Sequence, residues 1–407
     1  MINRSEYLKT LIRWRDKNDL IKVVTGIRRC GKSTLFQLFQ AYLKEQGVLD
    51  AQILPINLEL ADYAHLLDYQ ALHSYILSHC APGKMTYVFL DEIQMVPEFQ
   101  KAVNSLRLHK NIDLYITGSN AYMFSQKLTT LLAGRYIEIK MLPLSFKEYM
   151  SAFPELTENA YDRKFNEYIT YGSFPQILDF YHKGGFDNLA WHNYLESIYN
   201  TIIVKDIMAR QGIKELSKLE RVIRFMFSNI GSETSLSKIS NVLNADAKGN
   251  IHVQTIENYI EGLLDGYAFY KVLPNYLKGK GRLRSNAKYY AADTGLRYFL
   301  LGGNAGQDAG HILENIVFLE LKRRGYEVQT GRINQEEVDF VATLSGGKIE
   351  YYQVAQSILD ENTFQREIKP LKAIKDNYPK FILTRDYNTG NDNGIEILNV
   401  LKWLMQA

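Results

Sequence analysis

The sequence predicts an α/β protein whose first domain is a doubly wound parallel sheet, and three observations indicate this. Residues 21–35 read IKVVTGIRRCGKSTL, an apolar strand that runs into a glycine-containing loop and then a helix. Residues 85–92 read MTYVFLDE, a second apolar strand that ends in two acids. Five strand-like runs alternate with helical patterns around these two segments, which is typical of a parallel sheet covered by helices.

The loop after the first strand has the spacing of a phosphate-binding loop. It fills the pattern G-x-x-x-x-G-K-[ST] between a strand and a helix. Glycines let successive backbone N–H groups turn toward a phosphate, and the helix N-terminus adds positive potential. We therefore expect Lys32 to act catalytically on the β- and γ-phosphates of ATP and the Ser33 hydroxyl to coordinate Mg²⁺. The expected nucleotide-binding residues are Gly26, Ile27, Arg28, Arg29, Cys30, Gly31, Lys32, Ser33 and Thr34.

The two acids at the end of the 85–92 strand complete the predicted chemistry. Asp91 is expected to hold the Mg²⁺ shell directly or through water. Glu92 is expected to orient and polarise the water that attacks the γ-phosphate. A solvated acidic turn is the alternative, but the distance from the phosphate loop and the preceding apolar residues favour catalysis.

The remaining elements of this domain follow from apolar periodicity. Pro55 removes a ladder donor from the second strand, so we expect that strand at a sheet edge. The Gly118-Ser119-Asn120 turn after the fourth strand offers a polar side chain, Asn120, to the water or the γ-phosphate. The expected helices are 7–14, 32–45, 63–79 and 121–132, and the expected strands are 21–25, 51–58, 85–92, 112–117 and 136–140.

Because the Glu92 strand is third in sequence, another strand is expected between the two nucleotide motifs. This arrangement resembles the AAA+ ATPases. The resemblance implies ATP binding and hydrolysis, an edge position for the second strand, and an arginine near the fifth strand that stabilises transition-state charge, often across a subunit interface. Arg135 is the candidate for that arginine, with a surface residue that caps the preceding helix as the alternative.

The middle of the chain is predicted to be helical. Ser145 and Glu148 form a capping box that opens a helix. The aromatic-rich stretch at 146–212 is expected to be a lid whose apolar stripes form a core rather than a base-stacking platform. Lys205 and Arg210 receive no assigned role.

Residues 213–298 predict a winged helix-turn-helix, with three helices at 219–228, 235–243 and 253–264 followed by strands at 268–273 and 287–291. The stretch formed by these two strands and the hairpin between them is basic, with no acid from Lys271 to Lys288. It carries Lys271, Lys278, Lys280, Arg282, Arg284 and Lys288. Contact with DNA phosphates and a protein-binding role for this domain stay open as alternatives.

Residues 308–407 show the order helix, strand, strand, strand, helix, strand, which resembles the PD-(D/E)XK nuclease fold. The resemblance implies acids at Glu314 and Asp339, but Gln353 and Ala355 occupy the positions of the metal-binding glutamate and the lysine. An amide is a poor Mg²⁺ ligand and alanine cannot activate water. We therefore expect this domain, which follows a glycine-rich boundary at 300–310, to be inactive as a nuclease.

The whole chain resembles prokaryotic AAA+ ATPases that carry a C-terminal domain of unknown function related to restriction endonucleases. The expected domains are 1–145, 146–212, 213–298 and 308–407. The resulting hypothesis is a Mg²⁺-dependent ATPase that rearranges its winged-helix and C-terminal domains. A nucleotide-gated switch or protein-binding regulator with little turnover is the alternative.

Composition limits the partners. The chain has 407 residues, 46% of them apolar and 23% charged, which is globular, and its length suggests roughly two to four domains. A net charge of +3 does not by itself indicate a nucleic-acid partner. Two cysteines form no disulfide framework, and no run is long and apolar enough to cross a membrane, so we expect a cytoplasmic protein that binds no membrane. Oligomeric state and a protein partner stay open.

Overall fold

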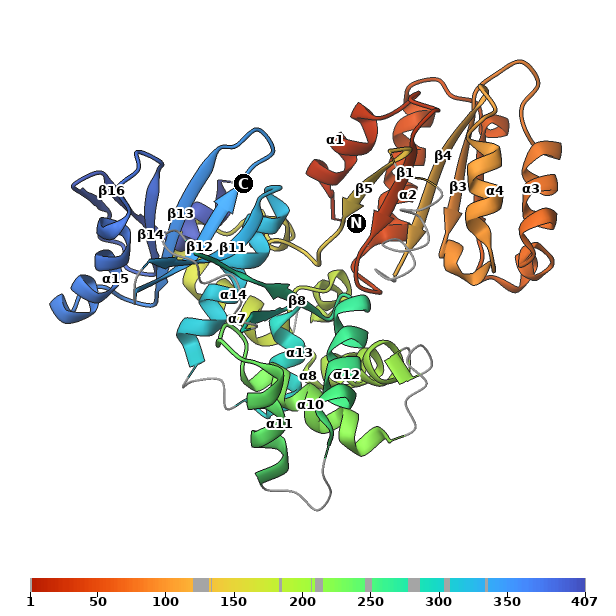
Figure 1. The fold of residues 1–407 in the computed structure, drawn as a ribbon. Coiled ribbons are helices and arrows are strands. Elements are labelled where there is room, and N and C mark those ends of the chain that lie inside the picture. The colour runs from red at the N-terminus through yellow and green to blue at the C-terminus, as the bar shows by residue number, and fades with distance from the viewer. Residues whose placement is uncertain are drawn as a thin grey trace. The chain divides into compact units, whose positions relative to one another are not determined.

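The computed structural model describes residues 2–119, 132, 134–182, 185–205, 207–208, 215–245, 251–276, 286–303, 308–333 and 336–406. The chain divides into two compact units (Figure 1). Unit 1 is Met1–Pro143 with Asp265–Tyr267, and unit 2 is Leu144–Leu264 with Ala268–Ala407. Each unit is described by itself. None of the helices in the described ranges is long and apolar enough to cross a membrane.

Unit 1 contains a five-stranded sheet in the order β2-β3-β4-β1-β5, and every pairing in it is parallel. The strands are β1 (Ile21–Thr25), β2 (Ile53–Asn57), β3 (Thr86–Asp91), β4 (Ile112–Gly118) and β5 (Tyr136–Lys140). β4 lies between β1 and β3, and β2 with Pro55 lies at an edge, as the sequence predicted. The carboxyl ends of β1, β4 and β3 are therefore neighbours along one edge of the sheet.

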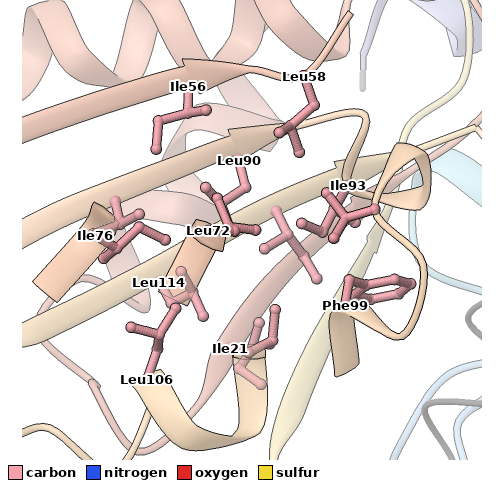
Figure 2. Close-up of a cluster of buried hydrophobic side chains, with 14 of the residues drawn as sticks. Ile21, Ile56, Leu58, Leu72, Ile76, Leu90, Ile93, Phe99, Leu106 and Leu114 are labelled. Carbon is pink, nitrogen blue, oxygen red and sulfur yellow. The ribbon is translucent and has the colours of Figure 1, made fainter. Parts of the chain in front are cut away.

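Helices cover both faces of this sheet because its buried strands are apolar on both sides. The helices of unit 1 are α1 (Ser5–Arg13), α2 (Lys32–Glu45), α3 (Tyr69–Ser78) and α4 (Phe99–Leu106). On one face, Leu72 of α3 and Leu106 of α4 pack in a buried cluster with Leu90 and Leu114 of the sheet (Figure 2). On the other face, aromatic rings of α2 meet aromatic rings of the sheet, Phe36 with Phe89 at 5.2 Å between centroids. The helix expected at 63–79 is instead a 3₁₀ turn (Ala61–Leu66) followed by α3, whose N-cap is Asp68.

Unit 2 begins with short helices around an aromatic core. They are α6 (Phe146–Met150), α7 (Tyr161–Tyr171), α8 (Asn188–Ile198) and a π-helical turn (Tyr199–Lys205), with the small hairpin β6 (Tyr181–His182) and β7 (Gly185–Phe186). The predicted capping box of Ser145 and Glu148 is present. Phe165 and Tyr168 of α7 are buried, which confirms that this stripe is core. Leu189 of α8, which the apolar periodicity of 189–198 had placed in a second buried stripe, is 72% exposed and is not part of the core.

Three helices followed by an antiparallel strand pair come next in unit 2. They are α10 (Leu216–Ser228), α11 (Leu236–Ala245), α12 (Val253–Asp265), β8 (Phe269–Val272) and β10 (Lys288–Ala291). The hairpin residues 277–285, which include Lys278, Lys280, Arg282 and Arg284, lie outside the described residues. Helix α13 (Thr294–Leu301) follows, capped by Asp293, and the sequence analysis did not predict it.

The last part of unit 2 is a seven-stranded mixed sheet in the order β15-β16-β14-β13-β12-β11-β9. Its strands are β9 (Pro274–Tyr276), β11 (Glu327–Ile333), β12 (Glu336–Thr343), β13 (Ile349–Ala355), β14 (Lys380–Thr384), β15 (Gly390–Asp392) and β16 (Ile395–Asn399), and its helices are α14 (Ala309–Arg323), α15 (Glu361–Ala373) and α16 (Val400–Met405). The predicted element order from α14 to β14 is observed. Sequence reasoning missed β9, β15, β16 and α16. β9 precedes the expected domain boundary at 300–310, yet it joins this sheet by pairing with β11.

Candidate active site

The loop between β1 and α2 has a backbone that side chains at its glycine positions would disturb. Gly26 has φ 146°, and a Cβ built there would lie 2.1 Å from the carbonyl oxygen of Met141. Gly31, the N-cap of α2, has φ 103°. Both φ values lie in the region that favours glycine. The loop therefore keeps a tight turn that ends at a helix N-terminus, the arrangement that binds anions.

Lys32 lies at the start of α2 and is only 4% exposed. Its ammonium donates hydrogen bonds to the carbonyl oxygens of Gly26 at 3.1 Å and Ile27 at 3.3 Å. The same ammonium lies 3.7 Å from Oε1 of Glu92. The structure thus brings the phosphate-loop lysine next to the acid expected to act on water. Ser33 and Thr34 occupy the first turn of the same helix, and Ser33 is exposed.

Thr117 of β4 links the two acids at the end of β3. Its hydroxyl donates to Oδ1 of Asp91 and accepts a hydrogen bond of 2.9 Å from the backbone N–H of Glu92. Glu92 has φ 53°, a left-handed conformation that is uncommon for a residue other than glycine. Asp91 and Glu92 are nevertheless both nearly buried, at 8% and 7% exposure. Strain and burial concentrated on one acidic pair are typical of a functional site.

The Glu92 carboxylate is held at both oxygens. Oε2 accepts hydrogen bonds from Ser119 Oγ at 3.1 Å and from Gln94 Nε2, and Oε1 faces Lys32. Gln94 Oε1 is buried, with no hydrogen-bond partner among the described residues. Gln94 and Thr117 were not predicted from the sequence to belong to this site. Thr117 precedes the polar turn that was singled out, and Gln94 lies two positions after Glu92, but neither spacing indicates a hydrogen bond.

A third acid lies near this pair. Glu59, which follows β2, accepts a hydrogen bond of 3.1 Å from Arg28 of the phosphate loop. Desolvation and the Glu92 carboxylate raise the pKa of Glu59, and Asp91 adds to this effect while Arg28 opposes it. The acids at this edge of the sheet therefore repel one another. The Ser33 hydroxyl and the Asp91 carboxylate offer oxygen ligands, the kind that Mg²⁺ prefers.

Arg4 supports the phosphate loop from outside it. Its guanidinium is 2% exposed and donates to the carbonyl oxygens of Cys30 at 2.9 Å and Leu142 at 2.7 Å. This ties the loop to the segment that follows β5. Burial raises the pKa of the Cys30 thiol, which favours the unreactive protonated form. Cys30 is thus a small buried loop residue in this structure.

The structure does not bring Arg135 to the site. Arg135 is exposed and precedes β5, and its carbonyl oxygen accepts a hydrogen bond from the backbone N–H of Ile21, at the amino end of β1. The phosphate loop begins at the other end of that strand. Arg135 also lies near Arg107, since it contributes, after burial, to lowering the pKa of Arg107. Asn120 and Arg210 lie outside the described residues, as does the side chain of Lys205.

Glu314 and Asp339, the acids expected from the resemblance to nucleases, lie near a lysine. Lys288 of β10 is 7% exposed and lies 2.8 Å from Oε1 of Glu314 and 2.7 Å from Oε1 of Glu337. We expected Lys288 to be part of the basic stretch that could contact DNA phosphates. That expectation is wrong for Lys288, because its ammonium is buried in these ion pairs. Gln353 donates from Nε2 to Glu367 at 2.7 Å. In the described ranges, no group of three or more His, Cys, Asp or Glu side chains is arranged to hold a metal ion.

Asp339 lies beside this cluster and accepts a hydrogen bond of 2.8 Å from the backbone N–H of Val354. Desolvation and the Glu314 carboxylate raise the pKa of Asp339 well above its usual range, although Lys288 opposes the shift. Burial also acts to raise the pKa of Glu314, but the Lys288 ammonium together with hydrogen bonds from His311 and Tyr290 outweighs it, so that pKa is lowered. The Lys288 ammonium therefore stabilises the negative charge of Glu314 more than that of Asp339.

Comparison with known proteins agrees with this geometry. Residues 18–150 match the family described as "AAA domain", and residues 162–307 match one described as "Domain of unknown function (DUF8612)". An uncharacterized protein of Haemophilus influenzae is 40% identical over 100% of this chain and 99% of its own length. An uncharacterized protein of Methanocaldococcus jannaschii is 30% identical over 93% of this chain and 84% of its own length.

Among solved structures, the Orc1 protein of Aeropyrum pernix in complex with DNA is similar at a TM-score of 0.35 and 12% identity. That match covers 76% of this chain and 93% of the Orc1 chain. The parallel sheet, the phosphate loop and the AAA match confirm the mixed α/β fold predicted for the first domain. The chain belongs to the same family as the two uncharacterized proteins, and its residues 18–150 form a P-loop ATPase domain of the AAA class.

Proposed function

We propose that this chain is a Mg²⁺-dependent ATPase that couples ATP hydrolysis to rearrangement of its helical, winged-helix and nuclease-like parts. The observation that carries the proposal is the 3.7 Å approach of the Lys32 ammonium to the Glu92 carboxylate, at the end of a glycine loop and beside Asp91. A phosphate-binding cation and a water-orienting acid lie within one small, nearly buried site.

Each residue has one task in this mechanism. The backbone N–H groups of residues 26–31 and the N-terminus of α2 bind the phosphates, and Lys32 neutralises charge on the β- and γ-phosphates. Ser33 and Asp91 hold Mg²⁺, which fits its preference for few carboxylates together with phosphate and water oxygens. The bound ion supplies further neutralisation of phosphate charge. Glu92 accepts a hydrogen bond from the attacking water and orients it.

The test is steady-state ATPase activity and ATP affinity in three variants. Lys32→Ala is expected to lose ATP binding, because it removes the charge in the loop. Glu92→Gln is expected to keep ATP affinity and to lose about 10²–10⁴-fold in kcat. Lys44→Ala is the matched control, since Lys44 is on the same helix but its side chain is 55% exposed and pairs with Asp50. Unchanged affinity in Lys32→Ala, or wild-type turnover in Glu92→Gln, would contradict the mechanism.

One observation favours a second candidate, a nucleotide-gated switch with slow turnover. Both oxygens of Glu92 are already engaged, by Lys32 on one side and by Ser119 and Gln94 on the other. A carboxylate held in this way has to be released before it can orient water. In this candidate, ATP binding or a protein partner releases Glu92, and the bound state is the signal.

We propose that Arg135 acts at the nucleotide site of a neighbouring subunit in an oligomer, because it lies away from the site of its own chain. Mixing the inactive variants Arg135→Ala and Glu92→Gln tests this assignment. Some sites in a mixed oligomer would combine an intact Glu92 with an intact Arg135, so activity would return. No recovery on mixing would reject a role across subunits.

We propose that unit 2 contains a winged helix-turn-helix over residues 213–298. We also propose that residues 308–407 form a nuclease-like domain without nuclease activity. The order of three helices and an antiparallel strand pair supports the first. The order from α14 to β14 supports the second. Lys288 takes the place of a cation between Glu314 and Glu337, and Gln353 is bonded to Glu367, which supports the absence of cleavage. DNA contact through the basic hairpin is part of this proposal.

A further inference from the structure

Unit 2 contains a cavity of about 290 Å³ that the ATPase mechanism does not use. Helices α7, α13 and α14 supply most of its walls. Gln356 and Arg385 also line it, and they directly follow β13 and β14. These two strands run parallel, so their carboxyl ends open at the same edge of the sheet. Open α/β sheets bind their ligands in the crevice outside the carboxyl ends of parallel strands.

The lining of the cavity combines apolar surface with positive charge. Its described residues include two arginines, several hydroxyl and amide groups, and no acid. The apolar part comes from rings and aliphatic chains such as those of Phe165 and Ile312. The volume lies at the small end of the roughly 300–1,000 Å³ that is typical of small-molecule sites. Charge and size together point to a small ligand that carries an anionic group.

Arg297 of α13 is the more buried of the two arginines, at 1% exposure. Its Nε donates to the carbonyl oxygen of Phe227 at 3.0 Å, and its Nη2 donates to Asp308 at 2.5 Å. Its Nη1 is buried and has no hydrogen-bond partner among the described residues. Buried donors in folded proteins are almost always paired, so an unpaired guanidinium nitrogen in a cavity wall calls for a ligand.

Each of the two arginines forms an ion pair with an acid that does not line the cavity, so the two guanidinium groups are the only charged groups among its described lining residues. Asp308 and Asp162 are not among the lining residues, and their side chains are 37% and 38% exposed. Arg385 donates to Asp162 at 2.7 Å and to Asn166 at 3.1 Å, and its guanidinium lies 5.5 Å from the centroid of Phe165. Burial lowers the pKa of Arg297, against the effect of Asp308. An anion in the cavity would stabilise the charged form of this guanidinium.

The walls of the cavity are held in place independently of any ligand. Asp293 caps α13 and accepts hydrogen bonds from the backbone N–H of Ser173 at 2.6 Å and from its hydroxyl at 2.7 Å. A Cβ at Gly295 would lie 2.4 Å from the carbonyl oxygen of Tyr171, so α13 and the end of α7 pack in direct backbone contact. A preformed site loses little conformational entropy when it binds.

We propose that this cavity binds a small organic anion whose carboxylate or phosphate group pairs with Arg297 and Arg385 and whose apolar body packs on Phe165 and Ile312. A ligand of this class would connect α7 and α13 to the carboxyl ends of β13 and β14. The site is separate from the nucleotide site of unit 1 in residues and in chemistry, since it has no glycine loop and no acid among its described lining residues.

The test is calorimetric titration of the full chain with phenyl phosphate, phenylacetate and the neutral analogue benzyl alcohol. We expect at least one of the two anions to bind, and the neutral analogue to bind about tenfold more weakly or not at all. Binding of phenyl phosphate alone would assign a phosphate ligand, and binding of phenylacetate alone a carboxylate ligand. A crystal soaked in iodide should also show an anomalous peak inside the cavity.

Two variants and a control make the test specific. Arg385→Gln, which changes a partly exposed residue, is expected to weaken anion binding about tenfold, and Arg297→Lys by a similar factor if it folds. Arg366→Gln is the control, because Arg366 is 73% exposed and lies outside the cavity. Equal affinity in Arg385→Gln and wild type would overturn the proposal. So would equal binding of the neutral analogue, or the absence of both anion binding and an iodide peak in the wild type.

Discussion

Replacing Gln94 by leucine tests whether the Glu92 carboxylate, which we propose orients the attacking water, is restrained. Gln94 Nε2 and Ser119 Oγ both donate to Oε2 of Glu92. Leucine has a similar size but no donor, so Gln94→Leu removes one of these two hydrogen bonds and also the buried Oε1 of Gln94, for which the described residues supply no hydrogen-bond partner. If the restraint limits turnover, this variant releases the carboxylate and hydrolyses ATP faster than wild type.

The magnitude follows from the strength of a hydrogen bond to a charged group, about 1.5–3 kcal/mol net. Losing it shifts the balance between restrained and released Glu92 by roughly tenfold to a hundredfold. The ion pair with Lys32 remains and limits the gain. We therefore expect basal kcat to rise about tenfold, with ATP affinity unchanged, because Gln94 does not belong to the phosphate loop.

The assay is steady-state ATPase at saturating MgATP, with ATP affinity measured separately. The double variant Gln94→Leu/Glu92→Gln is the control, and it should be as inactive as Glu92→Gln alone if the gain acts through Glu92. A fall in kcat for Gln94→Leu would show instead that Gln94 assists hydrolysis. An unchanged kcat would show that the observed hydrogen bond does not limit turnover, and either result would refute the restraint.

Three further predictions concern unit 2. The folded-state pKa of Asp339 is raised, so the wild type loses stability as pH rises from about 4 through that pKa, and Asp339→Asn should be more stable than wild type at pH 7. The advantage should vanish below about pH 4 in urea denaturation at both pH values, and equal stability at pH 7 would contradict the assigned repulsion from Glu314. Neutralising the four basic residues at 278–284 should flatten the salt dependence of DNA binding by roughly one unit of slope per lost phosphate contact, and an unchanged slope would favour a protein partner. The chain should not cleave linear, nicked or branched DNA in Mg²⁺ or Mn²⁺, and cleavage that Asp339→Ala abolishes would show an active site there.

The sequence alone determined the parts of the ATPase domain that are local in the chain. The phosphate loop, the helix that begins at Lys32 and the acids at the end of β3 could all be predicted, because backbone turn, helix start and strand end depend on neighbouring residues. The edge position of β2 also followed from one residue, since Pro55 lacks the N–H that an inner strand needs. The capping box at Ser145 is a short-range hydrogen-bond pattern of the same kind.

Only the tertiary structure decided which distant residues complete each site. Arg4 lies far from Cys30 in the chain, and no spacing rule connects a helix-cap residue to a loop carbonyl that it supports. Lys288 has the charge of a DNA-contacting residue, and its burial between Glu314 and Glu337 depends on how β10 packs on α14. The same holds for Arg297, whose Nη1 has no partner in the described part of the chain, a fact that is apparent only once its other donors are placed. Local backbone preference can be read from neighbours in the sequence, whereas hydrogen-bond partners and burial are set by packing between segments that are remote in the chain.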